Sequence, residues 1–132
     1  MTTRVMESSW ELALPDRWEW QRDDECVTLY DPEGVGALQV SAATKNSVVT
    51  DEDLRGFASE HIEAGAKIRE LACGDFSGFM LAFGTTDAYW RHWYLSEGRE
   101  MLFVTYNCSP NDRGIEDQPI AEILGSLRLR AE

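Results

Sequence analysis

The chain has no long apolar run, few cysteines and few basic residues. No apolar stretch approaches the roughly 18–20 residues that a helix needs to span a bilayer, and Met1–Glu7 lacks the apolar segment of a secretory signal. Cys26, Cys73 and Cys108 are isolated and odd in number, without Cys-x-x-Cys spacing, which argues against a disulfide framework and a zinc site. We therefore predict a cytoplasmic protein whose cysteines are small residues in or near the core.

Positive charge is scarce. The chain carries 12 Lys and Arg against 24 Asp and Glu, which gives a formal net charge of −12. This charge argues against a protein that coats nucleic acid or anionic lipid, because both are negatively charged. The acids are densest in a segment where only Arg17 and Arg22 are basic: Glu7, Glu11, Asp16, Glu19, Asp23, Asp24, Glu25, Asp31 and Glu33. This segment is either a solvated face that keeps the protein soluble or a docking surface for a basic protein partner.

Motifs for catalysis and for metal binding are missing as well. Ser77, Ser96 and Ser109 lack the Gly-x-Ser-x-Gly context of a nucleophile, and no glycine-rich loop has phosphate-binding spacing. The run Asp23–Glu25 lacks the spacing of a calcium loop, so a solvated acidic turn is expected there. The sequence therefore predicts no cofactor, no metal site and no enzymatic activity.

The residues that are present can build one core. Hydrophobic residues make up 43% of the chain and include five tryptophans, and no repeat or linker divides it, so we expect a single domain over residues 1–132. Turns are predicted at Asp31–Gly34 and Ser96–Arg99. Phe79–Phe83 and Met101–Val104 are apolar at every position, which predicts central strands covered on both faces. Strand-like segments fall at 10–14, 26–30, 38–42, 68–73, 77–85, 88–96 and 100–108.

Two amphipathic helices complete the expected fold. The first is predicted over 51–66, where Thr50 and Asp53 match a capping box ahead of an apolar stripe of Leu54, Phe57, Ala58, His61, Ile62 and Gly65. The second is predicted over 116–126, with Pro119 in its first turn and a stripe of Ile120, Ile123, Leu124 and Leu127. The order β-β-β-α-β-β-β-β-α predicts an α+β fold, an antiparallel sheet of about six or seven strands flanked by these two helices.

Three stretches of the chain resemble one known family. Trp10–Trp18 is a strand followed by Leu-Pro, two residues and a tryptophan, Leu29–Ser41 is a hairpin, and Phe103–Ser109 precedes a helix that closes at Leu127. In these features the chain resembles the PsbP/DcrB-like superfamily, which includes photosystem subunits, a Ran-binding import factor and bacterial envelope lipoproteins. The resemblance implies a PsbP-like sandwich and a role in binding rather than catalysis, and it carries over no catalytic or metal-binding residue.

The predicted strand 88–96 carries the best candidates for a binding site. Arg91 can stack on its aromatic neighbours or offer its guanidinium to a carboxylate, and Trp, Tyr and Arg are enriched at binding hot spots. The alternative is that one face of this strand is core and the other an ordinary sheet surface. Side chains alternate across a strand, which places Trp90, His92 and Tyr94 on one face and Tyr89, Arg91 and Trp93 on the other.

Two functional hypotheses follow. The first is a non-enzymatic binding or protein-interaction module that docks a basic protein through its acidic rim and through Trp90, Arg91 and Trp93. The second is a small-molecule binder or enzyme with a pocket near residues 89–94, in which His92 acts as acid or base. His61 is expected to be a core or boundary histidine, with a ligand or base as the alternative.

Overall fold

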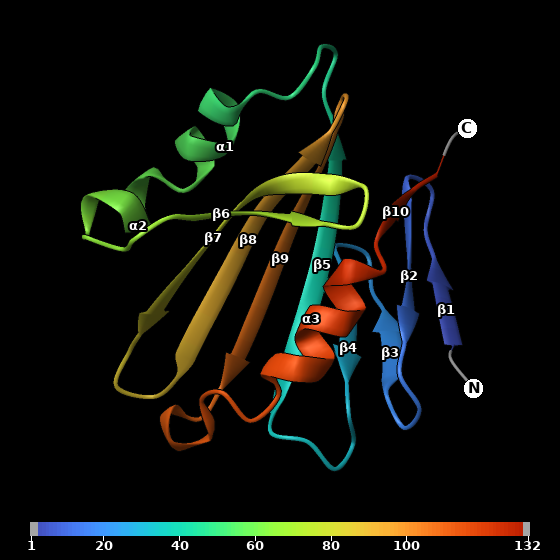
Figure 1. Cartoon of the computed structure of the whole chain (residues 1–132), viewed down its shortest axis with the longest axis vertical. Coiled ribbons are helices and arrows are strands. Elements are labelled where there is room, and N and C mark those ends of the chain that lie inside the picture. The colour runs from blue at the N-terminus through green and yellow to red at the C-terminus, as the bar shows by residue number, and fades with distance from the viewer. Residues whose placement is uncertain (1–2, 131–132) are drawn as a thin grey trace.

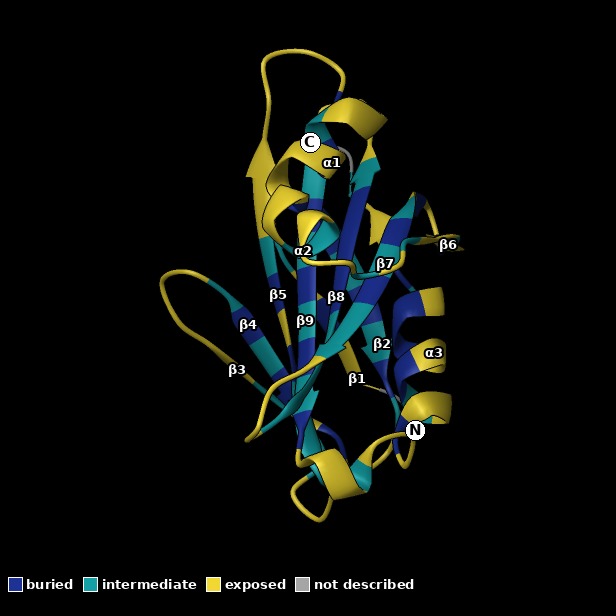
Figure 2. Cartoon of the chain, turned by 90° about the vertical axis from the view of Figure 1, so that its left-hand side faces the viewer, coloured by how far each residue is buried: buried dark blue, intermediate teal, exposed yellow. Residues whose placement is uncertain are grey.

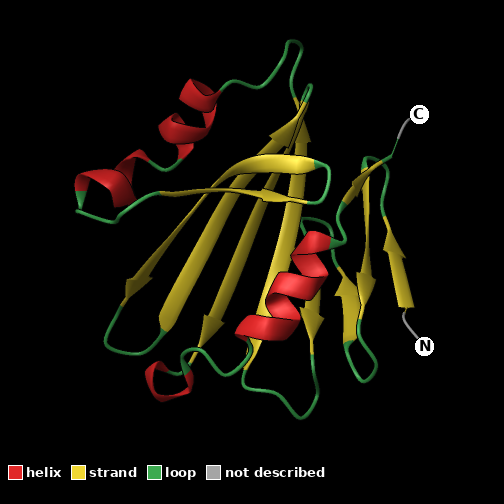
Figure 3. Cartoon of the chain, in the orientation of Figure 1, coloured by secondary structure: helices red, strands yellow, loops and turns green. Residues whose placement is uncertain are grey.

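Antiparallel hairpins build most of the molecule, for which a computed structural model describes residues 3–130. Seven strands form one sheet in the order β3-β4-β5-β9-β8-β7-β6, and three form a second sheet in the order β1-β2-β10 (Figure 1; Figure 3). The larger sheet contains β3 (Glu19–Arg22), β4 (Val27–Tyr30), β5 (Gly36–Thr44), β6 (Arg69–Cys73), β7 (Phe76–Gly84), β8 (Tyr89–Glu97) and β9 (Glu100–Cys108). The smaller sheet contains β1 (Thr3–Met6), β2 (Trp10–Leu14) and β10 (Arg128–Leu129). The predicted α+β class is confirmed.

Both predicted turns join neighbouring strands. Between β4 and β5, the Gly34 amide donates to the Asp31 carbonyl at 2.8 Å, and the Asp31 carboxylate accepts from the Glu33 amide at 2.9 Å. Between β8 and β9, Gly98 has a φ of 60°, a left-handed conformation that glycine adopts without steric cost. The resulting pairings place β9 between β5 and β8, as the apolar run Met101–Val104 predicts.

The expectation of a single sheet is wrong, because β2 pairs with β1 and β10 rather than with a strand of the larger sheet. The short strands β1, β3 and β10 were not predicted, since each has few residues and exposes most of them. On β2, Trp10, Leu12 and Leu14 are buried and join the main hydrophobic cluster. The smaller sheet therefore covers part of one face of the larger sheet.

The first predicted helix is divided in two. Its capping box is confirmed: the Asp53 amide donates to the Thr50 hydroxyl at 3.1 Å, and the Thr50 amide donates to the Asp53 carboxylate at 2.9 Å. The helix breaks at the buried Ala58, which gives α1 (Asp51–Phe57) and α2 (Ser59–Glu63). Gly56, a weak helix former, precedes the break. Phe57 was expected in the buried stripe but is 66% exposed.

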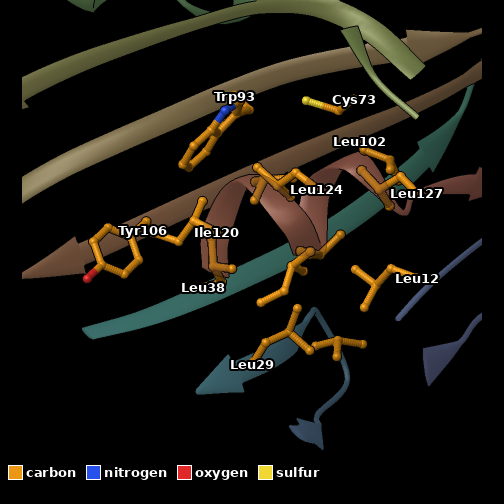
Figure 4. Packing of buried hydrophobic residues seen from close by; sticks show 14 of the residues in the cluster. Leu12, Leu29, Leu38, Cys73, Trp93, Leu102, Tyr106, Ile120, Leu124 and Leu127 are labelled. Atoms are coloured by element: carbon orange, nitrogen blue, oxygen red, sulfur yellow. The ribbon is translucent and has the colours of Figure 1, made fainter. Parts of the chain in front are cut away.

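The second predicted helix is confirmed as α3 (Asp117–Gly125), which follows a 3₁₀ turn, η1 (Pro110–Asp112). Figure 4 shows the α3 residues Ile120 and Leu124 among side chains from the larger sheet. All four residues of the predicted stripe are buried: Ile120, Ile123, Leu124 and Leu127. Over residues 3–130 no helix is long and apolar enough to cross a membrane.

The larger sheet thus has a hydrophobic cluster on each face. The α3 face holds the larger cluster, shared with the smaller sheet, and the opposite face holds a smaller cluster with α1 and α2 (Figure 2). The run Phe79–Phe83 lies in β7, which is next to the edge strand β6 rather than central. Both of its faces are nevertheless covered, because Phe79 and Leu81 pack in the smaller cluster and Met80 packs against the larger one.

Candidate functional site

A groove of about 370 Å³ opens between the α1–α2 pair and the larger sheet. Figure 2 views the molecule from a side on which both helices lie over the strands. A largely apolar cavity with a few convergent polar groups is the usual form of a small-molecule site. The residues that line this one are Ser41, Ala42, Ala43, Phe57, His61, His92, Tyr94, Met101 and Phe103.

Cross-strand pairing assembles the floor of the groove. Ser41 in β5 lies opposite Phe103 in β9, and Phe103 lies opposite Tyr94 in β8. Residues directly opposite each other in an antiparallel sheet share a face, so these three form one row. The ring centroids of Tyr94 and Phe103 are 5.1 Å apart, and Phe79 in β7 extends the row at 5.2 Å from Tyr94. The floor is therefore mainly aromatic.

The two histidines of the chain meet at the groove. His61 in α2 and His92 in β8 have ring centroids 5.1 Å apart. The His61 ring stacks on Phe83 at 4.3 Å. The His92 ring meets Phe83, Trp90 and Phe103 in edge-to-face contacts at 5.0, 5.9 and 5.2 Å, and His92 is only 8% exposed. Aromatic rings therefore enclose most of the His92 imidazole.

Burial keeps His92 and Tyr94 neutral. Burial, with a smaller contribution from His61, lowers the pKa of His92 to about 4, so its imidazole is uncharged at neutral pH. Burial raises the pKa of Tyr94, so its hydroxyl stays protonated. The Tyr94 hydroxyl lies 3.3 Å from Nδ1 of His92. Within the described chain, Nε2 of His92 has no hydrogen-bond partner. Every fully buried side-chain nitrogen or oxygen of the described residues has one. Nε2 is therefore not fully buried and reaches the accessible surface.

The five predicted site residues do not form one surface. Trp90 and His92 lie on the α1–α2 face, whereas Tyr89, Arg91 and Trp93 lie on the α3 face. The expectation that Trp93 is an exposed binding anchor is wrong, because it is 2% exposed. The side chains of β8 alternate between the two faces of the sheet, as predicted. However, β8 lies inside the sheet and α3 covers the face that carries Trp93. Tyr89, Trp90 and Arg91 are half-buried.

Both contacts predicted for Arg91 occur within the chain. Its guanidinium carbon lies 4.6 Å from the centroid of the Trp93 ring, within the range of a cation–π contact. Its Nη1 donates to the carboxylate of Asp117, in the first turn of α3, at 3.1 Å. Arg91 therefore joins β8 to α3.

Much of the acidic segment between residues 7 and 33 is engaged inside the chain. The Asp23 carboxylate accepts hydrogen bonds from the amides of Glu25 and Cys26 at 2.8 and 2.9 Å, and these bonds lower its pKa. Four other acids form ion pairs with arginines, namely Glu7 with Arg22, Glu11 with Arg4, and both Asp31 and Glu33 with Arg17. These contacts reduce the unpaired negative charge that the segment offers to a partner.

The cysteines behave largely as packing groups. Cys73 and Cys108 are buried, as predicted, Cys26 is half-buried, and all three are free thiols. Burial raises the pKa of Cys73 to about 11, which keeps it protonated and unreactive at neutral pH. In the described part of the chain, no three His, Cys, Asp or Glu side chains are arranged to hold a metal ion.

The sequence reasoning missed most of the groove lining. The helical periodicity predicts that Phe57 is buried, and no pattern in the sequence distinguishes Ser41, Met101 and Phe103 from other strand residues. Alternation in β9 places Met101 and Phe103 on one face, but only the pairing of β9 with β5 and β8 brings them to Tyr94 and Ser41. The missing information was the register between strands that are far apart in the sequence.

Comparison with solved structures shows that this chain has a β-rich α+β fold similar to that of two known proteins. A solved structure from Bacteroides thetaiotaomicron matches with a TM-score of 0.68 and 17% identity over 93% of this chain, which spans 46% of that protein. LpqN of Mycobacterium tuberculosis, described as involved in cell envelope biogenesis, matches with a TM-score of 0.61 and 13% identity over 99% of this chain and 91% of LpqN. No protein-family model and no curated protein matches the chain.

Proposed function

We propose that the protein is a non-enzymatic, cytoplasmic binding protein of the PsbP/DcrB-like group, and that the groove under α1 and α2 holds a small, uncharged, largely apolar ligand. The observation that carries this proposal is the aromatic floor formed by Phe103 and Tyr94, with the neutral imidazole of His92 beside it. Such a floor gains free energy by burying apolar ligand surface, while Nε2 of His92 and the Tyr94 hydroxyl supply hydrogen bonds that orient the ligand.

The electrostatics of His92 favour binding over catalysis. A general base works best with a pKa near the operating pH, whereas the pKa of His92 is about 4. The imidazole is therefore a weak proton acceptor at neutral pH. It remains a good hydrogen-bonding group, because one nitrogen of a neutral imidazole donates and the other accepts.

Titration with Nile red, a neutral dye that brightens in apolar surroundings, tests this function. The wild-type protein should bind the dye saturably at one site. The variant Ala43→Trp should bind it about tenfold more weakly, because Ala43 lines the groove and an indole there would fill it. Ala64→Trp is the matched control, since Ala64 is exposed and does not line the groove.

Circular dichroism and urea unfolding would establish that both variants remain folded. Non-saturable dye binding by the wild type, or equal weakening in the two variants, would contradict the proposal. Displacement of the dye by neutral aromatic or long-chain alcohols, but not by their charged analogues, would support an uncharged ligand.

A basic protein partner is a second candidate, favoured by the net charge of −12 and by the exposed side chains of Asp24 and Glu25. A decalysine peptide should then bind the protein, and added salt should weaken the complex. The double variant Asp24→Asn, Glu25→Gln should weaken it further, whereas Ala43→Trp should leave it unchanged. Peptide binding that ignores both salt and these substitutions would reject this candidate.

A further inference from the structure

A second cavity, of about 360 Å³, lies on the opposite face of the larger sheet, between α3 and the strands β6, β7 and β8. Strand register builds its sheet wall: Arg69 in β6 lies opposite Met80 in β7, and Met80 lies opposite Trp93 in β8. The other wall comes from α3, including Asp117. Figure 1 shows the end of the β6–β7 hairpin close to α3, which contacts β6.

A mostly buried cation, Arg91, lines the cavity. The Arg91 side chain is 17% exposed and stacks over Trp93, and its charge opposes the rise that burial imposes on the pKa of Cys73. A guanidinium has five N–H donors, but the single hydrogen bond of Arg91 within residues 3–130 runs from Nη1 to Asp117. Every fully buried side-chain nitrogen or oxygen in that range has a hydrogen-bond partner. The other nitrogens of Arg91 have none, so they are not fully buried and reach accessible space.

The carboxylate that faces Arg91 is weakly held. The Asp117 side chain is 65% exposed, and its contact with Arg91 joins one nitrogen to one oxygen. Arginine binds a carboxylate most strongly when two parallel N–H···O bonds form. The geometry therefore leaves room for a stronger acceptor than Asp117.

A second arginine lines the same cavity. Arg69 is exposed on the edge strand β6 and forms no ion pair within the described residues. Two guanidinium groups thus line one cavity in a protein whose net charge is −12. The half-buried side chains of Leu71 and Met80 supply apolar surface beside them.

From this arrangement we infer that the α3 cavity binds a small organic carboxylate, with Arg91 and Arg69 holding the anionic group and Leu71 and Met80 contacting an apolar body. The ligand carboxylate takes the free donors of Arg91 and displaces or shares its contact with Asp117. The apolar wall favours an organic acid over inorganic phosphate. This site lies on the other side of the sheet from the groove under α1 and α2, and the two sites share no lining residue.

Isothermal titration with 1-naphthoate, its neutral analogue 1-naphthamide and inorganic phosphate tests this inference on the full chain. Naphthoate should bind at least about tenfold more tightly than naphthamide or phosphate. Arg91→Met should weaken naphthoate binding about tenfold, and Arg69→Met about threefold. Arg99→Met, in the β8–β9 turn, is the matched control and should bind as the wild type does.

Asp117→Asn separates a ligand site from a purely structural ion pair. If Asp117 competes with the ligand for Arg91, the Asp117→Asn variant should bind naphthoate several-fold more tightly. This measurement tests the inference even if Arg91→Met does not fold. Equal affinities for naphthoate and naphthamide, or unchanged naphthoate affinity in Asp117→Asn and Arg69→Met, would overturn the inference. Ala43→Trp should leave naphthoate binding intact, so failure of the groove proposal would not affect this result.

Discussion

The two faces of the seven-stranded sheet are built by the same strands but are covered in different ways. On one face, α3 and Leu127, which follows it, bury all four residues of the predicted apolar stripe and share a cluster with the smaller sheet. On the other, the break at Ala58 divides the covering helix, leaves Phe57 exposed and opens a groove over aromatic rings. The comparison shows that the unbroken helix buries its whole apolar stripe, whereas the broken helix leaves one residue of its stripe exposed at the edge of a groove.

The largest expected effect concerns the packing beneath the two helical covers of the sheet, which are α3 on one face and the α1–α2 pair on the other. Ile123→Ala in α3 should lower the free energy of unfolding by about 3–4 kcal/mol, because Ile123 is fully buried in the larger cluster, lines neither cavity, and would leave an unfilled space. Leu54→Ala in α1 should cost about 2 kcal/mol, because the adjacent groove lets neighbours relax. Urea unfolding of both variants measures the difference. Equal costs would show that the two covers pack equally well.

Next in size is a pH effect confined to the groove face. The pKa of His92 falls from 6.5 to about 4 in the folded state. As the pH drops below 6.5, His92 therefore binds a proton in the unfolded chain before it does so in the folded protein. The free energy of unfolding decreases until the pH reaches about 4. We expect a loss of about 2 kcal/mol between pH 7 and pH 4.5, measured by urea unfolding. His92→Phe should flatten the profile in this window, and His61→Gln should retain most of the slope.

A buried polar pair on the α3 face should give an effect of similar or smaller size. The Tyr106 hydroxyl donates to the buried carboxylate of Glu116 at 2.7 Å, and both burial and this bond raise the pKa of Tyr106. Tyr106→Phe leaves the carboxylate without this donor and should cost about 1–2 kcal/mol in the free energy of unfolding. Tyr30→Phe is the control, because the Tyr30 hydroxyl bonds with exposed partners. Equal losses in thermal unfolding would contradict this account.

The smallest expected effect returns to the groove cover. Thr50→Ala removes the side-chain cap of α1 and should cost about 1 kcal/mol. Thr50→Ser keeps the hydroxyl and should restore most of that loss. Because α1 lies over the groove, hydrogen exchange in Thr50→Ala should increase in α1 and α2 and stay unchanged in α3. Uniform acceleration in all three helices would mean that the two covers are not independent.

Local sequence patterns predicted individual helices, strands and turns better than they predicted which strands pair with one another. The capping box at Thr50, the turn at Asp31–Gly34 and the α3 stripe depend on residues close in sequence, and all three are confirmed. The second sheet was missed because β2 pairs with segments from opposite ends of the described chain. Alternation assigned Trp93 and His92 to different faces of β8, but it carries no information about what covers each face.

The pairing of β2 also has a kinetic consequence. The Ala13 amide donates at 2.8 Å to the Ser126 hydroxyl, which lies 113 residues further along the chain, and the Arg130 amide donates to the Ser9 carbonyl at 3.0 Å. Contacts over such separations form slowly because a long loop must close first. The hairpins β7–β8–β9 form between segments that are neighbours in sequence, so the groove side can assemble during synthesis. At that stage Trp10 and Leu12 do not yet pack against α3 and β10. Newly made chains therefore expose the α3 side longest, which makes it the side most open to aggregation or chaperone contact.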